Sequence, residues 1–76
     1  NQKNMTTYKE LKLEKTIKGG IEIEVTTIQK TIHLDNPFIT TYYEMTINGN
    51  AVGSNEMNQN QVDWYTENYE TYINQD

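Results

Sequence analysis

The stretch FITTYYEMTINGNAVGS, residues 38–54, decides the fold. Apolar and polar side chains alternate at its start, which predicts a strand over residues 38–47. Asn48 and Gly49 follow, and they form the strongest hairpin signal in the chain, because both residues readily take the positive φ angles of a two-residue type I′ turn. The turn predicts a short fourth strand over residues 50–53.

The alternation also divides the strand at residues 38–47 into two faces. The predicted turn sets Met45 opposite Val52. We expect the helix to cover the side of Met45, and the side of Tyr42 and Glu24 is the alternative. The side of Met45 also carries Ile39, Tyr43 and Ile47, and the other side carries Tyr42, Glu44 and Thr46. We expect Tyr42 to pack against a neighbouring strand, although its place on the polar face also makes it a candidate contact residue.

Two earlier alternating runs predict strands over about residues 8–17 and 21–34. After Val25 the apolar positions change from odd to even numbers, as Ile28, Ile32 and Leu34 show. A bulge near residues 26–27 would absorb this change. The segment Asp35, Asn36 and Pro37 then predicts a turn before the third strand, because Asn before Pro is pushed out of the helical region.

The connection between these two strands contains Lys18, Gly19 and Gly20. A three-residue loop at this point would bring Leu13 and Ile17, with Leu11, onto the face of Ile21 and Val25. The same register sets Glu14 opposite Glu24, a like-charge pair. Either neighbouring lysines offset this repulsion, or a partner uses the acidic spot.

The hydrophobic period changes from 2 to 3.6 near Ser54, which predicts a helix over about residues 55–74 with Ser54 as its N-cap. The reciprocal capping box is missing from this frame, because position 57 is methionine. One helical stripe should pack on the sheet, and it contains Val62, Tyr65, Tyr69, Tyr72 and Ile73. We therefore predict one small α+β domain over residues 1–76, an antiparallel β-meander of three long strands and a short fourth, followed by one C-terminal α-helix packed on the sheet.

The charge is polarised along the chain. All six basic residues are lysines at or before Lys30, whereas residues 31–76 hold seven carboxylates and neither lysine nor arginine. The formal net charge is -5. An acidic field of this kind attracts basic surfaces and repels phosphate, so direct nucleic-acid binding is not expected.

The predicted helix places acidic and large apolar residues on the side away from the core. Asp63, Glu67 and Glu70 form one row, and Met57 and Trp64 share the adjacent face. Together these define a candidate partner-binding set, which consists of Glu56, Met57, Asp63, Trp64, Glu67 and Glu70. The alternative interpretation is a solvated helix face, with Trp64 covering an edge of the sheet.

Neither an enzyme nor a metal or cofactor site is predicted. The chain has no cysteine and one histidine, His33, which lies between two apolar residues and suits a structural role. Ser54 is the only serine, and it lacks an oriented base. Gly19 and Gly20 lack the spacing of a phosphate-binding loop. No apolar run is long enough to span a membrane.

The resulting hypothesis is a non-enzymatic acidic binding protein. In size, acidity and AT-rich coding bias, the chain resembles small phage inhibitors of bacterial defence nucleases, including anti-CRISPR proteins. This resemblance of type implies a phage or mobile-element protein in the cytoplasm of a bacterial host. Such a protein would block a host nucleic-acid enzyme, of anti-CRISPR or anti-restriction type, by covering its basic surface or mimicking nucleic acid. The alternatives are a structural or oligomerisation module that forms a homodimer, and a cell-surface binding domain.

Overall fold

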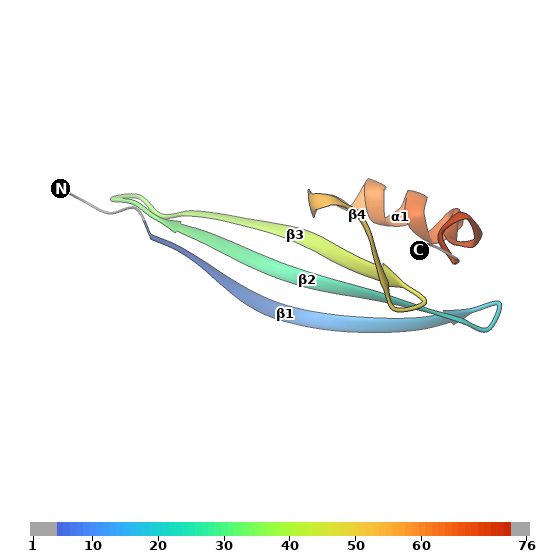
Figure 1. Cartoon of the computed structure of the whole chain (residues 1–76). Coiled ribbons are helices and arrows are strands. Elements are labelled where there is room, and N and C mark those ends of the chain that lie inside the picture. Colours follow the sequence, from blue (N-terminus) through green and yellow to red (C-terminus); the bar gives the residue numbers. More distant parts are fainter. Residues whose placement is uncertain (1–4, 74–76) are drawn as a thin grey trace.

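The computed structural model describes residues 5–73, which form one antiparallel sheet followed by a helix (Figure 1). The sheet contains β1 (Met5–Lys18), β2 (Ile21–His33), β3 (Phe38–Ile47) and β4 (Asn50–Met57), in the order β1-β2-β3-β4. Helix α1 (Gln59–Glu67) and the 3₁₀ helix η1 (Tyr69–Tyr72) come last, and α1 packs against β3 and β4. The predicted α+β meander with a C-terminal helix is confirmed. The molecule is elongated, with extents of 51 × 23 × 19 Å.

The β1–β2 connection is a two-residue turn, so the predicted three-residue loop is wrong. Gly19 and Gly20 have φ angles of +57° and +77°, as a type I′ turn requires. Lys18 therefore pairs directly with Ile21. Because this register differs by one residue from the predicted one, the apolar residues of β1 lie on the opposite face of the sheet from the one expected.

The new register also removes the predicted repulsion between Glu14 and Glu24. Lys15 lies opposite Glu24, and its Nζ is 3.4 Å from Glu24 Oε2. The bulge is likewise not at residues 26–27, because the pairing shifts at Leu11 in β1. Since β2 runs without interruption, its even-numbered apolar residues lie on the face away from α1.

The Asn48–Gly49 turn is confirmed, with φ angles of 54° and 82° and Met45 paired with Val52. Strand β4, however, continues to Met57 rather than ending at residue 53. Its next pair after Met45–Val52 joins Met57 to Tyr43, so residues 53–56 of β4 all lie beside a single residue of β3. This large bulge bends β4 away from the sheet.

Helix α1 begins later than predicted, because Asn58 and not Ser54 is its N-cap. The Asn58 side chain accepts a hydrogen bond from the Gln61 N–H at 2.9 Å, and Gln61 Oε1 accepts one from the Asn58 N–H at 2.8 Å. This capping box satisfies two free N–H groups and fixes the start of the helix. The α-helix also ends earlier than predicted, at Glu67, and the chain continues as the 3₁₀ helix η1. Only residue 74 of the predicted helix lies outside the described residues.

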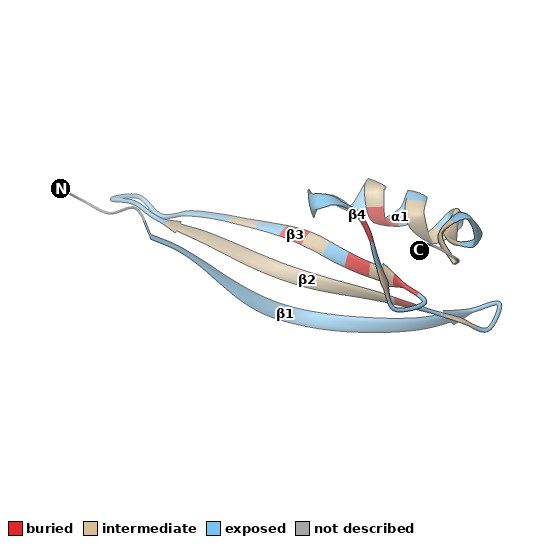
Figure 2. Ribbon diagram, in the orientation of Figure 1, coloured by how far each residue is buried: buried red, intermediate tan, exposed pale blue. Residues whose placement is uncertain are grey.

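The core lies at the helix end of the sheet, where Figure 2 shows the buried segments in red. It contains Ile23, Met45, Ile47, Val52, Met57 and Val62. Half-buried residues that pack against it include Tyr43 of β3, Tyr65 of α1, and Tyr69 and Tyr72 of η1. The predicted core-facing stripe is thus confirmed for Val62 and the three tyrosines that follow it, whereas Ile73 is not among the residues that pack on the core. Every residue of β1 is exposed, so Leu11, Leu13 and Ile17 do not belong to the core.

Candidate protein-binding surface

Four of the six predicted partner-binding residues are exposed and lie on the two C-terminal helices. Helix α1 turns Val62 into the core, which directs its neighbours outward. The outward residues are Asp63, Trp64 and Glu67 of α1 and Glu70 of η1, and all four are exposed. We call these four residues the α1 surface.

Trp64 is the large apolar residue of the α1 surface, and 52% of it is exposed. Its ring centroid is 5.1 Å from that of Tyr65 and 6.3 Å from that of Tyr72, both in edge-to-face geometry. Contacts of this kind hold one side of the indole while the other side faces solvent. Trp64 is therefore held by two tyrosine rings and leaves about half of its surface exposed.

The carboxylates of the α1 surface are not neutralised by lysines. None of the ion pairs among residues 5–73 involves Asp63, Glu67 or Glu70, and Asp63 accepts only a neutral hydrogen bond from Gln59 Nε2, at 2.9 Å. Asp63 and Glu67 are one helical turn apart and repel each other. Glu67 also lies at the C-terminal end of α1, where the helix dipole disfavours negative charge. Helix stability therefore does not explain these charges.

Lys18 marks the boundary of the α1 surface. Its Nζ lies 5.4 Å from the centroid of the Tyr69 ring and 3.5 Å from the carbonyl oxygen of Thr66. Both contacts favour a cation, through the ring face and through the C-terminal end of the helix. Lys18 thus ties the β1–β2 turn to the helix.

The other two predicted residues lie elsewhere, because β4 extends over their positions. Met57 is 1% exposed and belongs to the core, so its predicted place beside Trp64 is wrong. Glu56 lies in the β4 bulge, and its Oε2 accepts a hydrogen bond from Lys30 Nζ at 2.9 Å. This hydrogen bond raises the pKa of Lys30. Neither residue is part of the α1 surface.

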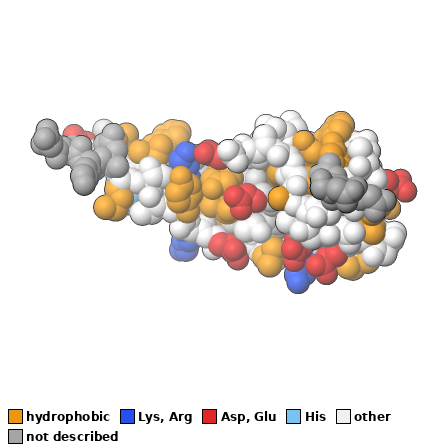
Figure 3. All heavy atoms as spheres, in the orientation of Figure 1, with side chains coloured by type: hydrophobic (Ala, Val, Ile, Leu, Met, Phe, Trp, Pro, Cys, Tyr) orange, Lys and Arg blue, Asp and Glu red, His pale blue; other side chains and the backbone are white. Residues whose placement is uncertain are grey.

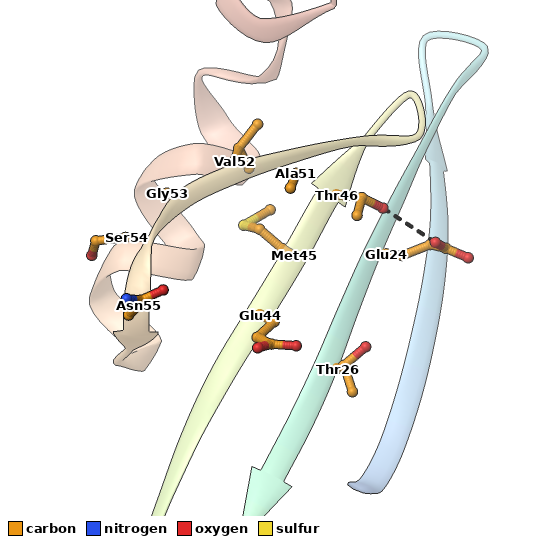
Figure 4. A pocket seen from close by; sticks show the side chains of 10 residues that line it. All are labelled: Glu24, Thr26, Glu44, Met45, Thr46, Ala51, Val52, Gly53, Ser54 and Asn55. Carbon is orange, nitrogen blue, oxygen red and sulfur yellow. Dashed lines mark hydrogen bonds between the residues drawn. The ribbon is translucent and has the colours of Figure 1, made fainter.

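The β4 bulge creates a hollow that the sequence did not predict (Figure 4). The hollow has a volume of about 310 Å³ and contains two carboxylates, those of Glu24 and Glu44. Glu24 accepts a hydrogen bond from Thr46 Oγ1 at 3.1 Å. The remaining lining residues are Thr26, Met45, Ala51, Val52, Gly53, Ser54 and Asn55. The sequence feature that could have indicated this bulge is Gly53, because a glycine inside a strand often marks a bulge. Its φ of +87° interrupts the pairing of β4 with β3.

Tyr42 is a packing residue and not a contact residue, because only 8% of it is exposed. It lines a second hollow, of about 450 Å³, together with Tyr8, Ile28, Glu44, Asn55 and Glu56. Burial raises the pKa of the Tyr42 phenol, and the nearby Glu44 carboxylate raises it further. Tyr42 thus packs beside Ile28 on the face of the sheet opposite to α1.

The other side chains that could take part in catalysis or bind a metal are dispersed. His33 Nε2 lies 2.9 Å from Thr7 Oγ1, across the β1–β2 ladder. Residues 5–73 contain no group of three or more side chains that could hold a metal ion. In the same part of the chain, no helix has the length and apolarity needed to cross a membrane. On the face drawn in Figure 3, acidic side chains are distributed along the molecule.

Comparisons with known protein families, curated proteins and solved structures found no match to this chain.

Proposed function

We propose that this chain is a non-enzymatic acidic binding protein that blocks a nucleic-acid enzyme of a bacterial host through protein–protein contact. The α1 surface would cover a basic surface of that enzyme, in part as a mimic of nucleic acid. A phage or mobile-element origin and a site of action in the bacterial cytoplasm belong to the same proposal, and both rest on coding bias and charge.

The observation that carries the proposal is the setting of Trp64. A half-exposed tryptophan lies on the same helix as Asp63 and Glu67, two carboxylates that make no ion pair among the described residues. Tryptophan is enriched among the few hot-spot residues that supply most of the affinity of a protein interface. Free carboxylates around such an anchor would steer it toward a basic partner and speed association.

The charge of α1 supports the same conclusion. Glu67 costs the helix about 0.3–1 kcal/mol through the dipole, and its repulsion with Asp63 costs about 0.2–0.5 kcal/mol more. A residue that destabilises its own helix is expected where it contributes to binding. The proposal therefore assigns Glu67 a binding role.

The test begins with capture of partners from a lysate of a low-GC bacterium, at low and at high salt. Association rates with the captured enzyme are then measured for the wild type, for Glu67→Lys/Glu70→Lys and for Trp64→Ala. We expect the charge reversal to slow association at least tenfold at low salt, because it removes steering. Trp64→Ala should weaken affinity about thirtyfold, as the loss of a hot-spot residue does. Competing duplex DNA should displace the wild-type protein if both occupy the same groove.

The matched control is Glu10→Lys/Asp35→Lys, which changes the net charge equally. Both residues are exposed, and the loop that contains Asp35 lies at the end of the sheet opposite to α1 (Figure 1). We expect this control to slow association less than threefold. Equal effects of the two charge reversals would show that net charge alone acts. An unchanged rate for Glu67→Lys/Glu70→Lys would refute the role of the α1 surface.

A further inference from the structure

Strand β1 is a long, open sheet edge. Its 14 residues pair with β2 on one side only, and all of them are exposed. An unpaired edge presents backbone N–H and C=O groups that can extend the sheet into another chain. Natural edges are often blocked by unpaired lysines, but two of the lysines of β1 already lie beside a carboxylate.

The charges of β1 are arranged on the two faces of the sheet. Glu14 pairs with Val25, which pairs with the buried Met45, so Glu14 lies on the same face as α1. Lys12 shares this face, and its Nζ is 3.6 Å from Glu14 Oε2. Leu13 lies between them on the opposite face, and 48% of it is exposed.

We propose that β1 pairs with β1 of a second copy, antiparallel about a two-fold axis at Leu13. Residues equally far before and after Leu13 face each other across this axis. Lys12 of each copy therefore faces Glu14 of the other. Each Lys12 then lies between two carboxylates, one from its own strand and one from its partner. On the opposite face the two Leu13 side chains meet. Cross-strand pairs of both kinds stabilise antiparallel sheets.

The neighbouring two-fold registers, with the axis at residue 11, 12, 14 or 15, are less favourable. An axis at Lys12, Glu14 or Lys15 would set like charges directly opposite each other at its centre. An axis at Leu11 would place the β1 bulge at the centre of the new ladder, where a bulge disrupts pairing. The register at Leu13 avoids both problems, because its three central pairs use only residues 12–14.

The assembly closes at two copies. A two-fold contact uses the same edge of both molecules, so no second β1 edge remains free. The other edge of the sheet is β4, whose bulge at residues 53–56 leaves no regular edge for further chains. The product is one eight-stranded antiparallel sheet. Since the axis is perpendicular to the sheet, both copies of α1 lie on the same face.

This inference is independent of the proposed function, because the centre of the proposed contact, Lys12–Glu14 of β1, contains no residue of the α1 surface. The experiment measures molar mass by sedimentation equilibrium as a function of concentration, since the chain mass is 8.9 kDa. The wild type should approach twice this mass. Lys12→Glu alone and Glu14→Lys alone should each weaken dimerisation at least tenfold, because each sets two like-charged pairs across the axis.

Two further samples make the register testable. An equimolar mixture of Lys12→Glu and Glu14→Lys should restore the dimer, because every facing pair is again of opposite charge. The double variant Lys12→Glu/Glu14→Lys should restore it for the same reason. Asp35→Lys is the control, since residue 35 is exposed and lies in the loop after β2, outside the new ladder, so dimerisation should be unchanged.

Three results would overturn the inference. A wild type that keeps the monomer mass up to about 1 mM excludes a significant dimer, since this corresponds to a binding free energy weaker than about -4 kcal/mol. A dimer that survives both single variants uses another surface. A dimer broken by Glu10→Lys and not by Glu14→Lys uses the axis at Leu11.

Discussion

Met57 provides a direct test of the observed core. Replacement by alanine removes most of a side chain that is 1% exposed and lies across the ladder from Tyr43. Truncation of a buried methionine to alanine typically costs about 2–5 kcal/mol. A domain of 76 residues is expected to have a total stability of about 4–11 kcal/mol, at roughly 0.05–0.15 kcal/mol per residue. Met57→Ala should therefore remove a large part of the stability.

The assay is urea unfolding, followed by circular dichroism. With a slope of about 1 kcal/mol per M urea, typical of a small domain, the midpoint should fall by about 2 M or more. Met57→Leu is the control, because it keeps the side-chain volume and should cost less than about 1.5 kcal/mol. A loss below about 1 kcal/mol for Met57→Ala, together with weaker partner binding, would place Met57 on the binding surface and refute its assignment to the core.

Two more perturbations test local features. Gly53→Ala should cost about 1–3 kcal/mol or more of stability, because its φ is +87° and an added Cβ would overlap the Met57 sulfur. Gly49→Ala is the control, because its φ of +82° is similar but the space around its Cβ is open, so it should cost less in the same urea assay. Equal losses for the two variants would contradict the packing argument. Tyr42 has a raised pKa, so its protonated form is favoured in the folded state, and stability should fall as the pH rises above the ordinary tyrosine value of about 10. Tyr42→Phe should reduce the loss of stability measured between about pH 8 and about pH 11. Identical pH profiles for the wild type and the variant would contradict this role of Tyr42.

The elements of this fold could be predicted where one local signal dominates. Asn48 and Gly49 admit few turn types, so the β3–β4 register followed from them. The stripe of Val62, Tyr65 and Tyr69 likewise identified the core-facing side of the helix. In both places the decisive residues are neighbours within one or two turns of the chain.

The errors occurred where two local solutions compete. Gly19 and Gly20 suit either a two-residue or a three-residue loop, and the choice reverses the faces of β1. Ser54 and Asn58 are both good N-caps, and only Asn58 has Gln61 at the capping-box position. The later helix start moved Met57 from the predicted surface into the core. Tertiary packing decides between the two loops, whereas the capping box of Asn58 and Gln61 is a local signal that favours the later helix start.

The candidate site was predicted in part for the same reason. Asp63, Trp64 and Glu67 keep their relative positions on any helix that includes them, so a later start did not separate them. The hollow beside Glu44 depends on the β4 bulge, which has no repeat pattern in the sequence.

The location of the core has a consequence for the order of folding during synthesis. Strands β1, β2 and β3 leave the ribosome first, but most of the side chains that cover the sheet come from β4, α1 and η1. Until those segments emerge, Ile23, Met45 and Ile47 have no cover, and a nascent chain with three finished strands exposes its future core to water. The meander can form hairpin by hairpin, but it becomes a stable domain only when the last described segment has been made.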